Sequence, residues 1–162
     1  MTQPTVPTQP TRPTRPTRPR LANIVVGVDD SPESLHALEL AATIGTPQQA
    51  TLTIVHIRPK LMAFGFGPDG SVEYAQAEAE LDKAITTEAT TRLAGYPGTW
   101  TVTIRSGHVS RELLALADEL DADLIVLGHS SHGTVHDAIL GSTAAGTVHH
   151  SRRSVLVAVA PR

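Results

Sequence analysis

The sequence contains no cysteine among its 162 residues, and only 3% of them are aromatic. The absence of cysteine excludes disulfide scaffolds, cysteine-ligated zinc, iron–sulfur sites and thiol catalysis. No apolar run approaches the about 20 residues that a membrane-spanning helix requires. Few aromatic residues and a formal charge of −3 argue against a nucleic-acid binder built on base-stacking platforms. We therefore expect no membrane span and no specific nucleic-acid partner.

The charge is unevenly distributed along the chain. Residues 1–20 hold six of the 12 prolines, one at every third position, together with four arginines and no acidic residue. Residues 21–162 keep 9 basic and 16 acidic residues, a formal charge of −7. A Thr-Arg-Pro repeat cannot bury apolar surface and lacks an amide donor at every third position. We therefore expect residues 1–20 to be a disordered, extended tail followed by one domain.

Three roles are compatible with this tail: an arm for anionic surfaces, a ligand for a proline-binding groove, or a leader without a specific partner. We favour the third role, because four spaced charges bind phosphate polymers weakly at cellular salt. The tail has no apolar core of the kind that a secretory signal needs, so we expect a cytoplasmic protein.

Residues 21–162 alternate between apolar runs and helical patterns. Runs rich in Val, Ile and Leu predict buried parallel strands at 24–28, 51–57, 100–105, 123–127 and 154–159. Apolar residues at helical spacing predict a helix after Ser31-Pro32, where the hydroxyl caps the start and proline suits the first turn. Further helices are expected near 113–120 and 72–93. This alternation predicts one α/β domain with a parallel sheet.

Parallel sheets bind ligands outside the carboxyl ends of their strands, so the residues that follow each predicted strand are the candidates. Asp29-Asp30-Ser31 follows the first strand, and His56-Ile57-Arg58 ends the second. The segment 128–133 follows the fourth strand and leads to Gly141-Ser142-Thr143 at a predicted helix start. Free N–H groups and hydroxyls at such a start suit a phosphate, but a plain glycine turn with a helix cap explains the same residues equally well.

These segments resemble the universal stress protein family. Gly128, Ser131, Gly141 and Ser142 are similar to its signature Gly-x2-Gly-x9-Gly-Ser/Thr. Ile-Val-Val-Gly-Val-Asp-Asp-Ser, Thr-Ile-Val-His-Ile, Ala-Asp-Leu-Ile-Val-Leu-Gly and Val-Leu-Val-Ala-Val match family motifs in the same order, over about residues 21–160. Several motifs in register are more specific than any one alone.

The resemblance implies a Rossmann-like three-layer α/β sandwich with a five-stranded parallel sheet, usually in a homodimer. One branch of the family binds ATP, with or without Mg²⁺. Transferred by position, Gly27, Asp29 and Ile57 would surround the adenosine, with Leu127 and Gly128 closing that side. Backbone groups and hydroxyls at seven positions would hold the phosphates: Gly128, His129, Ser130, Ser131, Gly141, Ser142 and Thr143.

Ser131 departs from the family pattern, which has glycine there. If the site needs a positive φ, serine introduces roughly 1–2 kcal/mol of strain or the loop reshapes. If the site needs only a small residue, the serine hydroxyl supplies one more hydrogen bond to phosphate. Both alternatives remain open.

Other motifs predict less. Gly-x-Gly-x-x-Gly at 65–70 follows no clear strand and contains Pro68, so we expect a loop and no dinucleotide fingerprint. No Walker-type Gly-Lys-Ser/Thr occurs. Gly128-His129-Ser130 begins like a hydrolase nucleophile elbow, but histidine occupies position 132 where glycine is required.

Histidines are numerous, but we expect none of them to form a metal site or a catalyst. His132 and His136 are four apart without a carboxylate that completes a metal-binding pattern. His56 lies inside a predicted strand and is expected to be a hydrogen-bonded core residue. His149 and His150 end the last predicted helix, where cationic groups suit the helix dipole.

The sequence therefore predicts a universal-stress-type domain at 21–162 that binds ATP or a related adenine nucleotide as a regulatory, stress-response module. No catalytic residue is assigned, and any ATP hydrolysis should be slow. The alternatives are a nucleotide-free dimeric interaction module of the same fold, and a hydrolase or transferase that uses Ser130 or Ser131. The last strand, from Ser154 to Val159, ends close to the chain end and is expected at a sheet edge that pairs with a second copy.

Overall fold

The computed structural model of the chain describes residues 20–59, 68–129 and 141–161. Strands and helices alternate along the described residues. Their order is β1 (Asn23–Gly27), α1 (Pro32–Gly45), the 3-10 helix η1 (Thr46–Gln48), β2 (Thr51–Pro59), α2 (Pro68–Arg92), β3 (Trp100–Gly107), α3 (Val109–Glu119), β4 (Leu124–Gly128), α4 (Ser142–His150) and β5 (Ser154–Ala158). The predicted tail lies outside the described residues except for Arg20.

The five strands form one parallel sheet in the order β3-β2-β1-β4-β5. Val26 of β1 pairs with Ile54 of β2 on one side and with Val126 of β4 on the other. The chain therefore builds outward from β1 to β3, returns across β1, and builds outward again to β5. This order confirms the predicted α/β fold and places β5 at an edge of the sheet.

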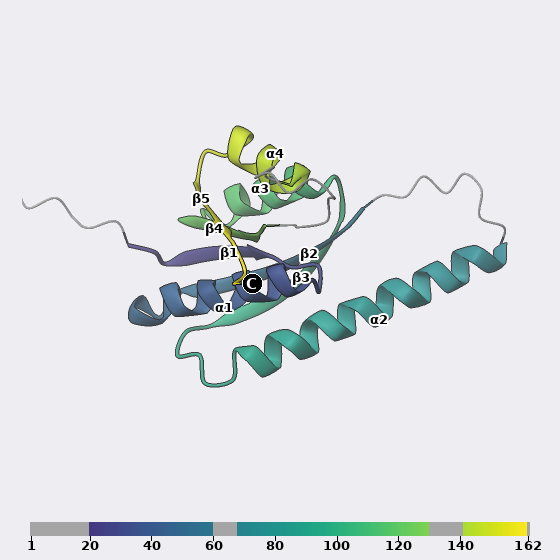
Figure 1. Cartoon of the computed structure of the whole chain (residues 1–162), viewed down its shortest axis with the longest axis horizontal. Helices are drawn as coiled ribbons and strands as arrows, with labels where there is room; N and C mark the ends of the chain where they lie inside the picture. The colour runs from purple at the N-terminus through teal and green to yellow at the C-terminus, as the bar shows by residue number, and fades with distance from the viewer. Residues whose placement is uncertain (1–19, 60–67, 130–140, 162) are drawn as a thin grey trace, which may run out of the picture.

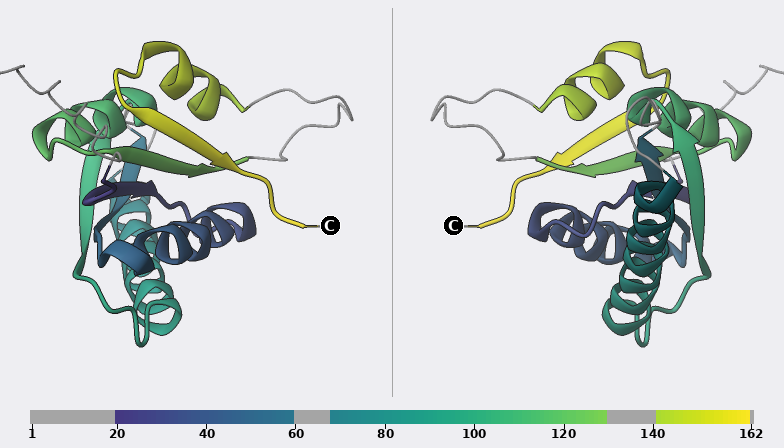
Figure 2. Two further views of the ribbon diagram at one scale, coloured as in Figure 1. Left: turned by 90° about the vertical axis from the view of Figure 1, so that its left-hand side faces the viewer. Right: turned by 90° about the vertical axis from the view of Figure 1, so that its right-hand side faces the viewer.

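Helices cover both faces of the sheet. Figures 1 and 2 show α1 and α2 on one face and α3 and α4 on the other, which gives the expected three layers. The buried residues form two clusters that follow this division: one combines the sheet with α1 and α2, and the other combines it with α3 and α4. Alternate residues of β2 show the division, because Ile54 belongs to the first cluster and Val55 to the second.

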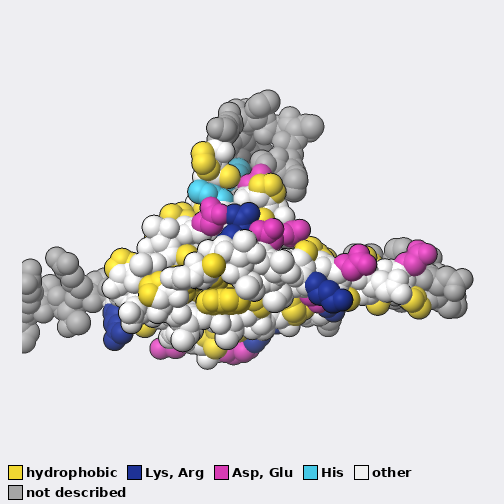
Figure 3. Space-filling model, turned by 90° about the horizontal axis from the view of Figure 1, so that it is seen from below, with side chains coloured by type: hydrophobic (Ala, Val, Ile, Leu, Met, Phe, Trp, Pro, Cys, Tyr) yellow, Lys and Arg dark blue, Asp and Glu magenta, His cyan; other side chains and the backbone are white. Residues whose placement is uncertain are grey.

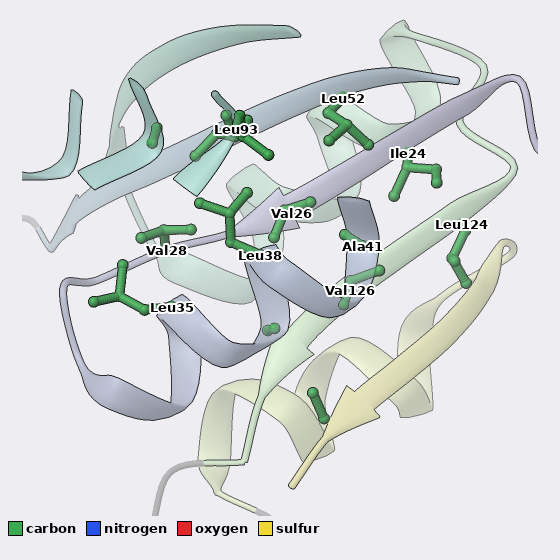
Figure 4. Packing of buried hydrophobic residues seen from close by; sticks show 14 of the residues in the cluster. Ile24, Val26, Val28, Leu35, Leu38, Ala41, Leu52, Leu93, Leu124 and Val126 are labelled. Carbon is green, nitrogen blue, oxygen red and sulfur yellow. The ribbon is translucent and has the colours of Figure 1, made fainter. Parts of the chain in front are cut away.

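The cluster on the α1 face is built from residues at helical spacing. Leu38 and Ala41 are fully buried against Val26 and Val126 of the sheet (Figure 4). Helix α1 begins where the sequence predicted, with Ser31 as its N-cap residue and Pro32 as its first residue. The apolar stripe and the cap together fix how α1 lies on the sheet.

Several element ends differ from the sequence prediction. Strands β2 and β3 are two residues longer than predicted, because they continue to pair as far as Pro59 and Gly107. Helix α2 begins at Pro68 rather than near residue 72. The expected loop at 65–70 is therefore wrong for residues 68–70, since proline needs no amide donor in the first turn of a helix. Residues 65–67 lie outside the described part.

The 25-residue helix α2 is attached to the sheet by a few apolar contacts and ion pairs. Ile85 and Ala89 are buried against the sheet, and Arg58 of β2 forms ion pairs with Glu78 and Asp82 of the helix.

No described helix, α2 included, is long and apolar enough to cross a membrane. In Figure 3, basic and acidic side chains are interspersed over the described part of the face shown.

Candidate functional site

The carboxyl edge of the sheet contains a reversal of strand order. Strands β1 and β4 are neighbours, yet the helices that follow them, α1 and α4, lie on opposite faces. Such a switch point leaves room between the departing segments, and ligands of open α/β sheets bind there. The starts of α1 and α4 at this edge are therefore the candidate positions for a ligand.

The turn between β1 and α1 is closed by its own hydrogen bonds. The Ser31 N–H and hydroxyl donate to Oδ1 of Asp29 at 3.2 and 2.6 Å. The Ser34 N–H donates to the Ser31 hydroxyl at 3.2 Å, which is the N-cap bond of α1. Asp30, between Asp29 and Ser31, has a left-handed φ of 64°, which an aspartate tolerates better than most residues. Asp29, Ser31 and Ser34 of this turn are thus hydrogen-bonded to one another.

The carboxylate of Asp29 is held in its charged form. Desolvation by the surrounding turn alone would raise its pKa, but the hydrogen bonds from Ser31 and Ser34 outweigh that effect, and His56 adds a smaller electrostatic contribution. The pKa of Asp29 is therefore lowered from its ordinary value. An aspartate in this state accepts hydrogen bonds at neutral pH and is no proton donor.

Gly128 allows α1 to approach the end of β4. A Cβ atom at this position would lie 2.5 Å from the carbonyl carbon of Glu33 and 2.7 Å from the Ser34 nitrogen. The neighbouring His129 N–H donates to the Ala158 carbonyl at 2.8 Å, so β5 already uses this amide. At the end of β4, the glycine and the next amide both contribute to packing of the fold.

Gly27, Ile57 and Leu127 pack against the face that α3 and α4 cover. Ile57 and Leu127 are 6% and 5% exposed and belong to the cluster on that face. A Cβ on Gly27 would lie 2.6 Å from Leu127 Cδ2. The side chains of Ile57 and Leu127 are thus part of the core, and Leu127 packs closely over Gly27.

His56 is the core histidine that the sequence predicted. Its ring is 5% exposed, and Nδ1 donates to the Val28 carbonyl at 3.0 Å. A carbonyl oxygen only accepts, so Nδ1 carries the proton. His56 therefore ties β2 to the segment that leads from β1 into the Asp29 turn.

The start of α4 differs from that of α1. Gly141 is the N-cap residue, and among the described residues no side chain caps the helix. The first intrahelical bond is from the Ala145 N–H to the Gly141 carbonyl at 2.8 Å. The N–H groups of Ser142, Thr143 and Ala144 thus precede the hydrogen-bond ladder and are positioned for an anion, which the helix dipole also favours.

A pocket of about 510 Å³ opens beside this helix start. Its described lining comes from the ends of β2 and β3, the start of α3 and the start of α4: Pro59, Gly107, His108, Val109, Ser142 and Thr143. The structure thus brings two predicted site residues, Ser142 and Thr143, into a pocket with four residues that the sequence reasoning missed. Pro59 and Gly107 lie in the unpredicted extensions of β2 and β3, and neither residue type favours a strand, so no local sequence signal marked them.

Ser130 and Ser131 lie outside the described residues, as do His132, Gly133 and His136. Both the serine-based hydrolase hypothesis and the alternatives for Ser131 depend on this segment. In the described ranges, no group of three or more His, Asp or Glu side chains is arranged to hold a metal ion.

Comparisons with known proteins agree with the fold and the motifs. A model of the universal stress protein family matches residues 21–158. Universal stress protein A homolog 1 from Coxiella burnetii is 34% identical over 139 residues, which are 83% of this chain and 93% of the relative.

Solved structures give the same result. The universal stress protein UspA from Lactobacillus plantarum superposes with a TM-score of 0.73 and 26% identity, over 86% of this chain and 98% of that one. A universal stress protein crystallised in complex with cAMP gives a TM-score of 0.65 and 29% identity, over 84% and 95% of the two chains.

Proposed function

This chain belongs to the universal stress protein family, and we propose that it binds an adenine nucleotide in the pocket beside the first turn of α4. We further propose that it acts in the cytoplasm as a nucleotide-dependent, stress-response regulator and not as a fast enzyme. The observation that carries this proposal is the pocket of about 510 Å³ into which an uncapped helix start opens.

The lining suits a ligand with one anionic and one apolar end. Ser142 and Thr143 offer hydroxyls and free N–H groups, whereas Pro59 and Val109 offer apolar surface. The volume lies within the roughly 300–1,000 Å³ that small-molecule sites occupy. A nucleotide with its phosphate at α4 and its base toward Pro59 and Val109 would satisfy both ends.

The relatives support an adenine base. The 29% identical structure was determined with cAMP, and we extend adenine-nucleotide binding from that protein to this chain. We propose ATP as one such nucleotide. None of the described lining residues is a carboxylate, so Mg²⁺ that accompanies ATP would be held by the phosphates.

We also propose a homodimer through β5. This strand is at the edge of the sheet, and Val159, directly after it, is 69% exposed. An unpaired parallel edge exposes backbone donors and acceptors as well as apolar side chains, and pairing with a second copy would cover both. A Val159→Asp substitution should shift the sedimenting species from dimer toward monomer, and an unchanged dimer would place the interface elsewhere.

The test of the proposed site uses Gly141→Asp. Gly141 has an ordinary φ of −51°, and aspartate is a favoured N-cap residue, so the variant should fold. Its carboxylate would take the free N–H groups and repel phosphate, and we expect ATP affinity to fall by a factor of about 100 or more. Gly141→Asn is the matched control, because it caps the helix without the charge and should weaken binding less.

Calorimetry with ATP and mass spectrometry of the purified protein supply the readouts. Unchanged ATP affinity in Gly141→Asp would show that the nucleotide binds elsewhere. A wild-type protein that carries no nucleotide and ignores millimolar ATP would contradict the proposed function and favour the nucleotide-free interaction module.

A further inference from the structure

His108 lines the pocket and is also the residue at which helix α3 begins. It is the N-cap residue of α3, yet its side chain makes no capping hydrogen bond. Its Nδ1 lies 3.2 Å from the hydroxyl of Ser110, and its exposed side chain lines the pocket with Ser142 and Thr143. The ring is therefore held at Nδ1 by a neighbour, and within the described ranges no hydrogen bond to Nε2 is formed.

Helix α3 packs against α4, and His108 lines the same pocket as the start of α4. Ser110 is 7% exposed, and a Cβ atom on Gly146 of α4 would lie 3.2 Å from its hydroxyl. Ser142 is four residues before Gly146 and thus lies one turn earlier on the same side of the helix. Ser110 therefore contacts the ring of His108 and faces the side of α4 that leads to Ser142.

The charges around the pocket make His108 distinctive. It is the one titratable side chain among the described lining residues. The carboxylate of Glu112 lies beside one lining residue, because a Cβ on Gly107 would lie 2.7 Å from its Oε1. Arg105 faces Glu112 at 3.8 Å and is shared with Glu119. A carboxylate thus adjoins the pocket lining at Gly107, and His108 is the lining side chain able to carry a positive charge toward an anion.

We propose that His108 is the residue by which this pocket distinguishes phosphorylated nucleotides from nucleosides, through a hydrogen bond from its Nε2 side to the phosphate at the start of α4. The inference rests on the proposed function and assigns a role to a residue outside the family signature. A neutral imidazole supplies one N–H donor and an imidazolium adds a positive charge. Adenosine has no phosphate and should not depend on this contact.

Two substitutions separate the charge of residue 108 from its effect on folding. Asn and Asp are both favoured N-cap residues, so His108→Asn and His108→Asp should leave α3 at least as stable as the wild type. They are alike in shape and differ in charge. A lost hydrogen bond to a charged group corresponds to about tenfold in affinity, and a carboxylate beside phosphate costs more, roughly a hundredfold. His149→Asn, at the opposite end of α4, is the histidine control.

The experiment is calorimetric titration of adenosine, AMP and ATP into the full chain and these three variants, with thermal unfolding recorded for each. We expect His108→Asn to weaken AMP and ATP about tenfold, His108→Asp to weaken them further, and adenosine affinity to stay constant in both. His149→Asn should match the wild type. Equal losses for adenosine and AMP, or no loss in His108→Asn, would overturn the assignment of His108.

The outcome also separates this inference from the proposed function. If the wild type binds AMP and Gly141→Asp does not, while the His108 variants behave as wild type, the site stands and the role of His108 is wrong. If the wild type binds none of the three compounds, the proposed function is contradicted and the role of His108 is contradicted with it.

Discussion

Helices α1 and α4 both begin at the carboxyl edge of the same sheet. Helix α1 follows β1, and α4 follows the segment after β4. The first turns of the two helices differ in their contacts. The first turn of α1 is capped by the Ser31 side chain and lies against the backbone at Gly128. The first turn of α4 has no side-chain cap and opens onto a pocket of about 510 Å³.

The start of α1 is therefore occupied by contacts within the fold, whereas the start of α4 is available to a ligand. The N–H groups of a helix start attract anions in either case, but at α1 a serine hydroxyl and close packing occupy the position. At α4, Ser142 and Thr143 line a pocket together with residues from three other elements. The family signature residue Gly128 thus contributes to packing of α1, whereas Gly141 and Ser142 belong to the open start.

The largest loss of stability should follow when a side chain is placed between α1 and the end of β4. Gly128→Ala would place a methyl group 2.5–2.7 Å from backbone atoms of Glu33 and Ser34, which cannot move without shifting the helix. We expect a loss of about 3 kcal/mol in the free energy of unfolding, measured by urea denaturation. Gly27→Ala is the control, because the atom that it meets is the end of the Leu127 side chain, and about 1 kcal/mol is expected. Equal losses would contradict the claim that α1 backbone limits Gly128.

A smaller loss of stability should distinguish the start of α1 from the start of α4. Ser31→Ala removes the cap of α1 and the 2.6 Å bond to Asp29, and should cost about 1 kcal/mol of stability. Ser142→Ala removes no cap and should change stability by less than about 0.5 kcal/mol, while it weakens nucleotide binding. Thermal unfolding with and without ATP measures both effects. A destabilised Ser142→Ala that binds ATP normally would reverse the comparison.

The smallest effect concerns the charge of Asp29. Its pKa is lowered in the folded chain from an ordinary value of 3.8, so the ionised group stabilises the fold above that pH. The contribution is lost as the pH falls through the lower, folded pKa. Because Asp29 is exposed, we expect Asp29→Asn to cost less than about 1 kcal/mol at pH 7 and nothing once both states are protonated. Urea denaturation at pH 7 and at pH 3 and below tests this, and a difference that grows on acidification would contradict it.

The sequence predicted the elements well where local patterns determine them. Ser31-Pro32 marks the start of α1, and the buried strands are recognisable because Val, Ile and Leu dominate β1 and β4 and recur through β2. The hydrogen-bonded role of His56 was also predicted. Family membership followed from several such motifs in register, and the comparisons confirm it.

The pocket was harder to predict, because non-local pairing forms it. Pro59 and Gly107 do not favour strands, yet they pair with each other across β2 and β3 and carry both strands to the edge of the pocket. The close approach of α1 to Gly128 joins residues almost a hundred positions apart. Neither contact leaves a periodic signal in the sequence, and so His108 and Val109 were not among the predicted site residues.

The most direct test of the central claim is an amide NMR titration of the full chain with AMP. We expect the resonances of Ser142, Thr143 and Ala144 to shift together with those of His108 and Val109, while those of Ser34 and Leu35 at the start of α1 stay in place. Shifts concentrated at the start of α1, with none at α4, would contradict it.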